Sequence, residues 1–476
     1  MKDNLLGKFL KFSYGSWVGL IIGLFTTMLV TRILPPDALG KASMFDLFVQ
    51  VCMILTIFGT DQAFVRFFYE EQSNKRGALL FNSLRIPLFA TIVIICLIVI
   101  FYQPITLFLF DKESLLLAFV IAGGIFAQLL FRFAQLVIRM QQKGNMYSLL
   151  QIFQKLFNLC LVISFFFLLG ANFEVLIFST LITLILLNII AIYFGKQFWS
   201  IDNLAIKNVK HSQREIIKFG APFVLTIFIS WLFEAFAKIA IRHWSTFDEL
   251  GLYSAAMRLV ALVMILKTTF STFWTPVAYE KFEKRPQDKD FFRNITIIVA
   301  FAMYLVAILS IAAKDLIVIL LGREYQDAAI IMPFLVFMPI FYTISETTVI
   351  GINFYKKINW HIFIAGMACG INILGNWLLV PDFGALGAAI STAISYIVFF
   401  TLRTIISLKY FKVKYPLVRI YIMALIVTIY AYFAIIIDNL WFVILLSFIP
   451  LSILIVLFYK DLKLIIKNRV TLVNRK

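Results

Sequence analysis

The chain has 476 residues, of which 62% are hydrophobic and only 14% are charged. Soluble domains carry about a quarter charged residues, so this composition excludes a soluble globular protein and is typical of a polytopic membrane protein. The net charge of +18 would fit a nucleic-acid partner, but the Lys and Arg residues lie in short loops between apolar runs. We interpret them as topology signals and expect no nucleic-acid partner.

Cofactor and metal chemistry finds no support in the residue pattern. The four cysteines lie within apolar runs without paired spacing, and the three histidines are scattered along the chain. This arrangement favours neither a disulfide framework nor a zinc site. No glycine-rich phosphate loop occurs, so ATP binding and other cofactors are not expected.

Apolar runs of membrane-spanning length follow one another along the whole chain. About 20 residues cross the hydrocarbon, and this length predicts 14 transmembrane helices. In the first half they cover 11–33, 42–66, 79–101, 114–138, 147–170 and 173–195. In the second half they cover 216–242, 251–275, 291–313, 327–350, 359–380 and 384–406, and two more cover 418–437 and 440–459.

The loops between these spans differ in basic residues. One alternate set, which includes both termini, holds 26 Lys and Arg residues, and the opposite set holds 4. Cytoplasmic loops carry the excess of positive charge, so both termini are predicted to be cytoplasmic. A missed or invented span would reverse the bias in every later loop, which supports the even number of spans.

The beginning of the chain is weakly repeated about 210 residues later. KF at 11–12 returns at 218–219, and DALG at 37–40 returns as DELG at 248–251. Six spans in each half give the two copies the same orientation, as in transporters built from parallel repeats. We therefore predict two pseudo-symmetric six-helix bundles, at 1–195 and 216–406. A cytoplasmic amphipathic linker at 196–215 joins them, and 407–476 adds two helices and a basic tail.

Charged and polar side chains interrupt several spans at helical spacing. Gln128, Arg132, Gln135 and Arg139 form a stripe in the fourth span, and Gln151, Gln154, Lys155 and Asn158 form one in the fifth. Other charges within spans include Asp46, Asp61, Glu234, Lys238, Arg258 and Lys267. The predicted topology places Asp46, Glu234, Lys238 and Arg258 in the outer half of the membrane and Arg132 and Lys155 in the inner half.

A charge facing lipid costs about 3 kcal/mol or more, so these groups must meet each other or water. Paired helix packing explains any one of them, for example Glu234 with Lys238 one turn away. For the whole set we favour a hydrated central cavity with excess positive charge. Such a cavity suits an anionic cargo such as a phosphate, because the Arg guanidinium matches its oxygens.

Two motifs and the plan of spans resemble the Wzx-type polysaccharide biosynthesis flippases. These flippases belong to the multidrug/oligosaccharidyl-lipid/polysaccharide exporter superfamily. The motifs are GTDQAFVRFFYE at 59–70 and PDFGALGAA at 381–389. The resemblance implies two bundles flanking a central cavity, two extra C-terminal helices and alternating access. In such proteins the first, second, seventh and eighth spans line the cavity.

The resemblance implies a non-enzymatic flippase in a bacterial cytoplasmic membrane. It would move an undecaprenyl-pyrophosphate-linked oligosaccharide to the outer leaflet for capsule, O-antigen or exopolysaccharide synthesis. Its partners would be the lipid-linked oligosaccharide, membrane lipids, a coupling H⁺ or Na⁺ and a polysaccharide polymerase. Arg258 and Lys238 would contact the pyrophosphate or acidic sugars, and Glu234 and Asp46 would act as counter-charges or coupling-ion sites. Asp61, Arg132 and Lys155 complete the candidate substrate-cavity residues.

One departure from the superfamily bears on the cargo. The first span carries no charge inside it before Arg32, whereas the related lipid-linked peptidoglycan precursor flippases have arginines there. This difference counts against a peptidoglycan precursor as cargo.

Two other functions remain open. A cation-coupled drug or metabolite antiporter of the same superfamily would share the fold, but a cavity rich in carboxylates would suit it better. A membrane oligosaccharide polymerase would need catalytic carboxylates on an external loop, where Glu324 and Asp327 are the candidates.

Overall fold

The computed structural model describes residues 5–205, 209–357 and 359–473. Within these ranges, 13 helices are long and apolar enough to cross a membrane. One of them, α17 (Asn359–Tyr410), has 52 residues and turns at Gly384, where φ is 50° and ψ is −130°. This helix contains two of the predicted spans, and the predicted all-α polytopic fold class is confirmed.

Contacts between residues divide the chain into two compact units, Met1–Trp231 and Leu232–Lys476. The boundary lies inside α10 (Gln213–Trp244). The bundle bounds and the central cavity proposed from the sequence stay predictions, and each unit is described here by itself.

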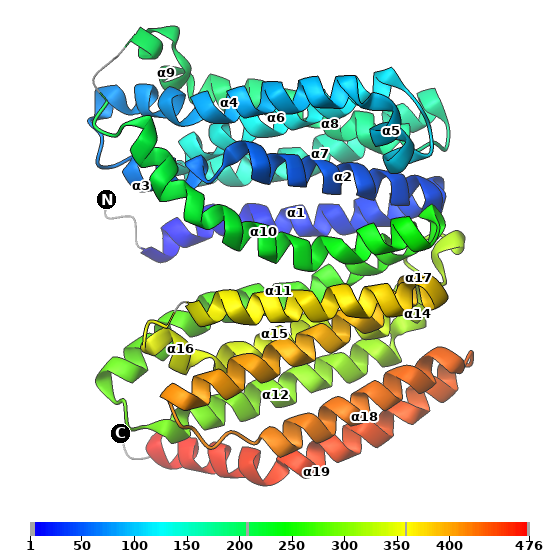
Figure 1. The fold of residues 1–476 in the computed structure, drawn as a ribbon. Helices are drawn as coiled ribbons and strands as arrows, with labels where there is room; N and C mark the ends of the chain where they lie inside the picture. Colours follow the sequence, from blue (N-terminus) through cyan, green and yellow to red (C-terminus); the bar gives the residue numbers. More distant parts are fainter. Residues whose placement is uncertain (1–4, 206–208, 358, 474–476) are drawn as a thin grey trace. The chain divides into compact units, whose positions relative to one another are not determined.

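Long helices packed side by side make up the first unit (Figure 1). They are α1 (Leu5–Ile33), α2 (Pro36–Ile57), α3 (Thr60–Phe67), α4 (Arg76–Ile100), α5 (Tyr102–Phe110), α6 (Leu115–Met140), α7 (Gly144–Leu169) and α8 (Glu174–Phe194), followed by α9 (Lys196–Trp199) and the first part of α10. Contacts join α1 to α7, α2 to α4 and α6, and α8 to α6 and α7. The sequence placed α5 in an external loop, but the apolar segment after Phe101 forms one more short helix.

Small and polar residues hold α1 against α7. A Cβ added to Gly15 would lie 2.4 Å from the backbone oxygen of Ser148, so only glycine permits this approach. The Ser148 hydroxyl donates to the Lys11 carbonyl at 2.8 Å, and Ser16 donates to Gln151 at 2.9 Å. Gln151, part of the predicted polar stripe of the fifth span, therefore serves helix packing here.

The predicted second span is not one continuous helix. It breaks after Ile57, because Phe58 (φ 48°) and Gly59 (φ 72°) both adopt left-handed conformations, and the chain resumes as α3. At the break the backbone lies against α10, where a Cβ on Gly59 would come within 2.2 Å of the Gly220 carbonyl oxygen. Two glycines from distant segments thus allow the bend and the contact together.

The segment predicted as a linker does not form one continuous helix over its described residues. The chain forms the four-residue α9 and a 3₁₀ turn, η2 (Ile201–Ala205), while residues 206–208 lie outside the described residues. The following segment is fixed to the first unit, because the backbone N–H of Lys210 donates to Glu71 at 2.8 Å and the His211 ring stacks on Phe67 at 4.0 Å.

Within the described residues, the second unit contains the rest of α10 and the helices that follow it (Figure 1). They are α11 (Phe247–Lys284), α12 (Lys289–Ala312), α13 (Lys314–Val318), α14 (Ala328–Leu335), α15 (Phe337–Thr348), α16 (Ile350–Phe354), α17, α18 (Leu417–Ile436) and α19 (Leu440–Val473). Contacts join α17 to α15 and α14, α12 to α15 and α19, and α18 to α19.

Two expectations about this unit need correction. The eighth span was expected to end near residue 275, but α11 continues to Lys284 with Pro276 inside it. The tenth span is divided into α14, α15 and α16, and the first interruption, at Val336, lies between Pro333 and Pro339. Each proline removes a backbone N–H donor, which weakens the helix on both sides of the interruption.

A carboxylate from α11 fixes the turn inside α17. The N–H of Ala385, directly after the turn at Gly384, donates to Glu249 Oε2 at 2.8 Å. Glu249 therefore caps the second half of α17 as a side-chain acceptor caps any helix start. It belongs to the DELG segment that the sequence repeat singled out, and it links that segment to the PDFGALGAA motif.

Gly59→Ala should lower the free energy of unfolding by about 1–3 kcal/mol, because alanine disfavours the left-handed conformation and its methyl group meets the Gly220 carbonyl. Thermal unfolding of the purified full chain measures this effect. Gly23→Ala is the matched control, since no atom lies within 4 Å of its added Cβ. Equal melting temperatures for the two variants would contradict the close approach at Gly59.

Glu249→Ala should destabilise the chain by about 1–2 kcal/mol, because the Ala385 N–H loses its acceptor. Glu249→Gln keeps an acceptor oxygen and should retain most of the stability. A thermal unfolding curve for Glu249→Gln that matches Glu249→Ala would show that the cap is not the source of the effect.

Candidate functional site

An ion pair joins two of the predicted site residues in the first unit. Arg132 Nη2 on α6 lies 2.6 Å from Asp61 Oδ2, and Arg132 Nε donates to the same oxygen at 3.1 Å. The Asp61 side chain is 5% exposed, while that of Arg132 is 38% exposed. The carboxylate is therefore enclosed, and part of the guanidinium stays open to its surroundings.

The break between α2 and α3 explains why Asp61 lies there. Asp61 falls in the first turn of α3, where the positive end of the helix dipole favours a carboxylate. Its Oδ1 also accepts from the backbone N–H of Gln62 at 2.8 Å. A continuous second span would have no helix N-terminus at this depth. The bend therefore provides the helix start that stabilises the Asp61 carboxylate.

The other predicted site residues lie on four helices. Asp46 on α2 and Lys155 on α7 are exposed at the surface of the first unit, and Lys238 on α10 and Arg258 on α11 are half-buried in the second. The stem of Lys155 lies against α1, with its Cγ 3.6 Å from a Cβ built on Gly19. The side chain of Glu234 lies outside the described residues.

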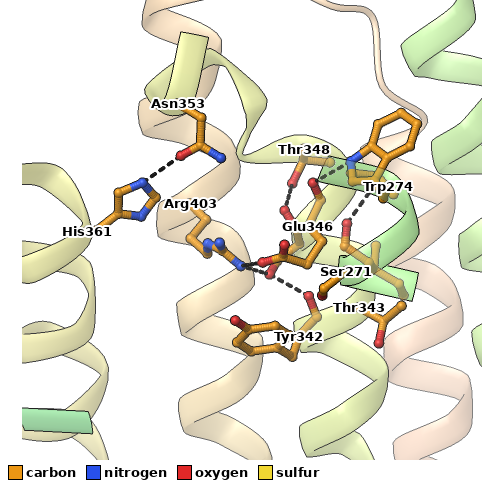
Figure 2. A network of polar contacts seen from close by, with 12 residues as sticks. Ser271, Trp274, Tyr342, Thr343, Glu346, Thr348, Asn353, His361 and Arg403 are labelled. Atoms are coloured by element: carbon orange, nitrogen blue, oxygen red, sulfur yellow. Dashed lines mark hydrogen bonds and ion pairs between the residues drawn. The ribbon is translucent and has the colours of Figure 1, made fainter. Parts of the chain in front are cut away.

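A second buried ion pair, which the sequence analysis did not identify, lies in the second unit (Figure 2). Arg403 Nη1 on α17 lies 2.8 Å from Glu346 Oε1 on α15, and these side chains are only 7% and 13% exposed. The same Nη1 donates to the Ser345 hydroxyl at 2.6 Å. The pair connects two helices inside the unit.

Aromatic rings and a second cation surround this pair. The Arg403 guanidinium lies 5.0 Å from the Phe399 ring centroid and 5.4 Å from that of Tyr342. Lys267 Nζ on α11 lies 3.7 Å from the same Tyr342 ring. Tyr342 thus lies between two cations, and its ring quadrupole favours both positions.

Neutral hydrogen bonds extend the network along α15 and α17. Trp274 Nε1 donates to the Glu346 carbonyl at 3.0 Å, and the hydroxyls of Thr348 and Thr404 lie 2.7 Å apart. Figure 2 shows Trp274, Thr348 and His361 in the neighbourhood of Arg403. The contacts with Glu346 and Ser345 hold the Arg403 guanidinium and limit its freedom to turn toward a ligand.

A sequence signal for this pair exists. Glu346 and Arg403 lie four and three residues before the predicted cytoplasmic ends of the tenth and twelfth spans. Opposite charges at the same depth in two spans of one bundle indicate a pair, since an unpaired charge there is costly.

Among the described residues, no group of three or more His, Cys, Asp or Glu residues is placed to hold a metal ion. The side chains around both ion pairs offer charge, hydrogen-bond donors and aromatic faces. Such groups can hold an ion or a polar molecule through electrostatic contacts and hydrogen bonds.

Arg403→Leu should lower the free energy of unfolding by about 3–5 kcal/mol, because it leaves Glu346 buried without a counter-charge. The double variant Arg403→Met with Glu346→Met should recover most of this loss. Thermal unfolding of the full chain in detergent measures both. If the single and double variants lose the same free energy of unfolding, the unpaired charge of Glu346 is not the cause of the loss.

The exposed pair Lys284 and Glu280 provides the control for that experiment. Its side chains are 71% and 64% exposed, so Glu280→Gln should leave the melting temperature unchanged.

Comparison with protein families gives a match over more than half of the chain. The model of the family described as "Polysaccharide biosynthesis protein" matches residues 8–282. That range includes the ion pair of Asp61 and Arg132 and the whole of α10. No match was found among curated proteins.

Solved structures give matches over almost the whole chain. A structure of the lipid II flippase MurJ in an inward closed conformation is 17% identical, with a TM-score of 0.70, and the match covers 96% of this chain and 99% of that one. An inward-facing multidrug resistance transporter of the MATE family and MOP superfamily is 14% identical, with a TM-score of 0.65, and the match covers 84% of this chain and 96% of that one. At these identities the matches establish a transporter-like fold.

Proposed function

The chain belongs to the polysaccharide biosynthesis protein family, and from that membership we propose that it is a flippase for lipid-linked oligosaccharides. It moves an undecaprenyl-pyrophosphate-linked repeat unit from the inner to the outer leaflet of a bacterial cytoplasmic membrane, for capsule, O-antigen or exopolysaccharide synthesis. The family match carries the proposal. The fold similarity to a flippase for another lipid-linked precursor, lipid II, supports it.

The physical requirement for such a protein is clear. A glycan and a pyrophosphate cannot enter hydrocarbon without losing their hydration, which costs many kcal/mol for a charged group. The prenyl tail is apolar and can remain in lipid. The protein therefore needs cations and polar groups within its spans for the head group alone, and transport needs no covalent step.

We propose Lys238 and Arg258 as the contacts of the pyrophosphate or of acidic sugars. They lie on consecutive helices of the second unit, and both are half-buried. A half-buried cation keeps more electrostatic strength than a fully hydrated one and can still be reached by a ligand. Glu234 and Asp46 are proposed as counter-charges or as sites of a coupling H⁺ or Na⁺.

In the first unit we propose that Arg132 and Lys155 also contact the cargo. Asp61 holds Arg132 through one carboxylate oxygen and leaves part of the guanidinium exposed, so the pair can present a positioned donor. Lys155 lies against α1 near Gly19. It supplies a cation beside α1, which carries no charge between Lys11 and Arg32.

The ion pair of Arg403 and Glu346 has a different proposed role. Its guanidinium is enclosed by Ser345, Glu346 and two aromatic rings, so we assign it to holding α15 and α17 together while the protein alternates between its two access states. For the whole protein, the proposed partners are the lipid-linked oligosaccharide and a polysaccharide polymerase.

Arg258→Gln and Lys238→Gln should each reduce transport at least tenfold, because each removes a charge-assisted contact with phosphate. The assay follows a fluorescent prenyl-pyrophosphate oligosaccharide in proteoliposomes and measures how much sugar becomes accessible on the far leaflet. Arg285→Gln, which removes an exposed charge at the end of the same helix as Arg258, should retain native transport.

Two results would refute parts of this proposal. If Arg258→Gln and Lys238→Gln both fold and transport at the native rate, Lys238 and Arg258 do not contact the cargo. Export of a small cationic compound against a proton or sodium gradient, without movement of lipid-linked sugar, would replace the flippase with an antiporter.

A further inference from the structure

The first unit contains a cavity of about 680 Å³ at one end of its helices, and neither Asp61 nor Arg132 is among the described residues that line it. Three connections build it: the segment between α3 and α4, the turn between α6 and α7, and the α9 and η2 region. The topology predicted from the loops makes this the cytoplasmic end. The volume lies within the range of small-molecule sites.

The cavity has an excess of positive charge. Among the described residues that line it, Arg76 and Lys143 are basic and none is acidic. The two nearby carboxylates have other partners, since Glu70 pairs with Arg66 and His211, and Glu71 accepts from the backbone N–H of Lys210. Among the described lining residues, no carboxylate therefore pairs with Arg76 or Lys143 inside the cavity.

Aromatic rings hold Arg76 in place at the first residue of α4. Its guanidinium lies 4.7 Å from the Phe68 ring centroid and 5.3 Å from that of Tyr69. Tyr69 is fixed in turn, because its hydroxyl donates to the Met140 carbonyl at 2.5 Å. This arrangement preorganises the guanidinium, which lowers the entropy lost when it binds a ligand.

Two lining residues also carry buried polar atoms without a partner in the described part of the chain. These atoms are Arg76 Nε and both side-chain amide atoms of Gln141, Nε2 and Oε1. Buried polar groups are normally hydrogen-bonded, so these atoms need a partner such as an ordered water molecule. The two nitrogens need acceptors, and the amide oxygen needs a donor.

From this geometry we propose that the cavity binds a phosphate ester. The phosphate oxygens accept from the Arg76 guanidinium. Lys143 adds a second positive charge. The source is the head group of an anionic lipid such as phosphatidylglycerol, or a soluble molecule such as a sugar or glycerol phosphate, and both have the same chemistry at the site.

Isothermal titration of the full chain in an uncharged detergent tests the site with two probes. Short-chain dihexanoyl phosphatidylglycerol represents the lipid, and glycerol 3-phosphate represents the soluble ester. Saturable binding of either probe, with no binding of glycerol, is the expected result. Binding of the lipid alone assigns the site to a head group, and binding of glycerol 3-phosphate assigns it to the phosphate ester itself.

Arg76→Gln and Lys143→Gln should each weaken binding about tenfold or more, since each removes a cation from the phosphate. Lys143 is exposed, so its variant remains informative if Arg76→Gln fails to fold. Arg139→Gln is the matched control, because Arg139 is exposed in the last turn of α6 and does not line the cavity. Absence of saturable binding, or equal weakening by Arg139→Gln, would overturn the proposal without affecting the proposed transport function.

Discussion

A charge inside the hydrocarbon must find a partner within the protein, and this constraint shapes both units. In the first unit it joins Arg132 to Asp61, and in the second it joins Arg403 to Glu346. Neither pair is formed by neighbours on one helix, so each fixes the contact between two separate segments. Replacing such a pair by apolar residues often costs little, but removing one partner costs much. These pairs therefore specify which helices meet, more than they add to the total stability.

The sequence was sufficient for the fold class because hydrophobic length and loop charge act over whole spans. Each span contributes about 20 residues to the signal, and each basic loop tests the count again. The merged helix α17 illustrates the limit of this signal. Its two spans follow directly on each other, and only the conformation of Gly384 separates them.

Local breaks and side-chain pairing were harder to predict. The bend at Phe58 and Gly59 depends on a contact with Gly220, which lies about 160 residues later and has no signal in the nearby sequence. Asp61 and Arg132 were recognised as site residues, but their pairing follows from that bend. Glu346 and Arg403 were missed because each is a single charge within an apolar run, without a stripe of polar neighbours. Their burial comes from the packing of α15 against α17, which periodicity alone does not specify.

The turn at Gly384 has a consequence for how this sequence can vary during evolution. A Cβ at this position would lie 2.9 Å from Glu249 Oε2, so the carboxylate that caps the turn also limits the residue that forms it. Positions 249 and 384 should therefore change together. A related chain with a larger residue at the turn should have a shorter one on α11, and would need a different acceptor for the buried N–H of residue 385.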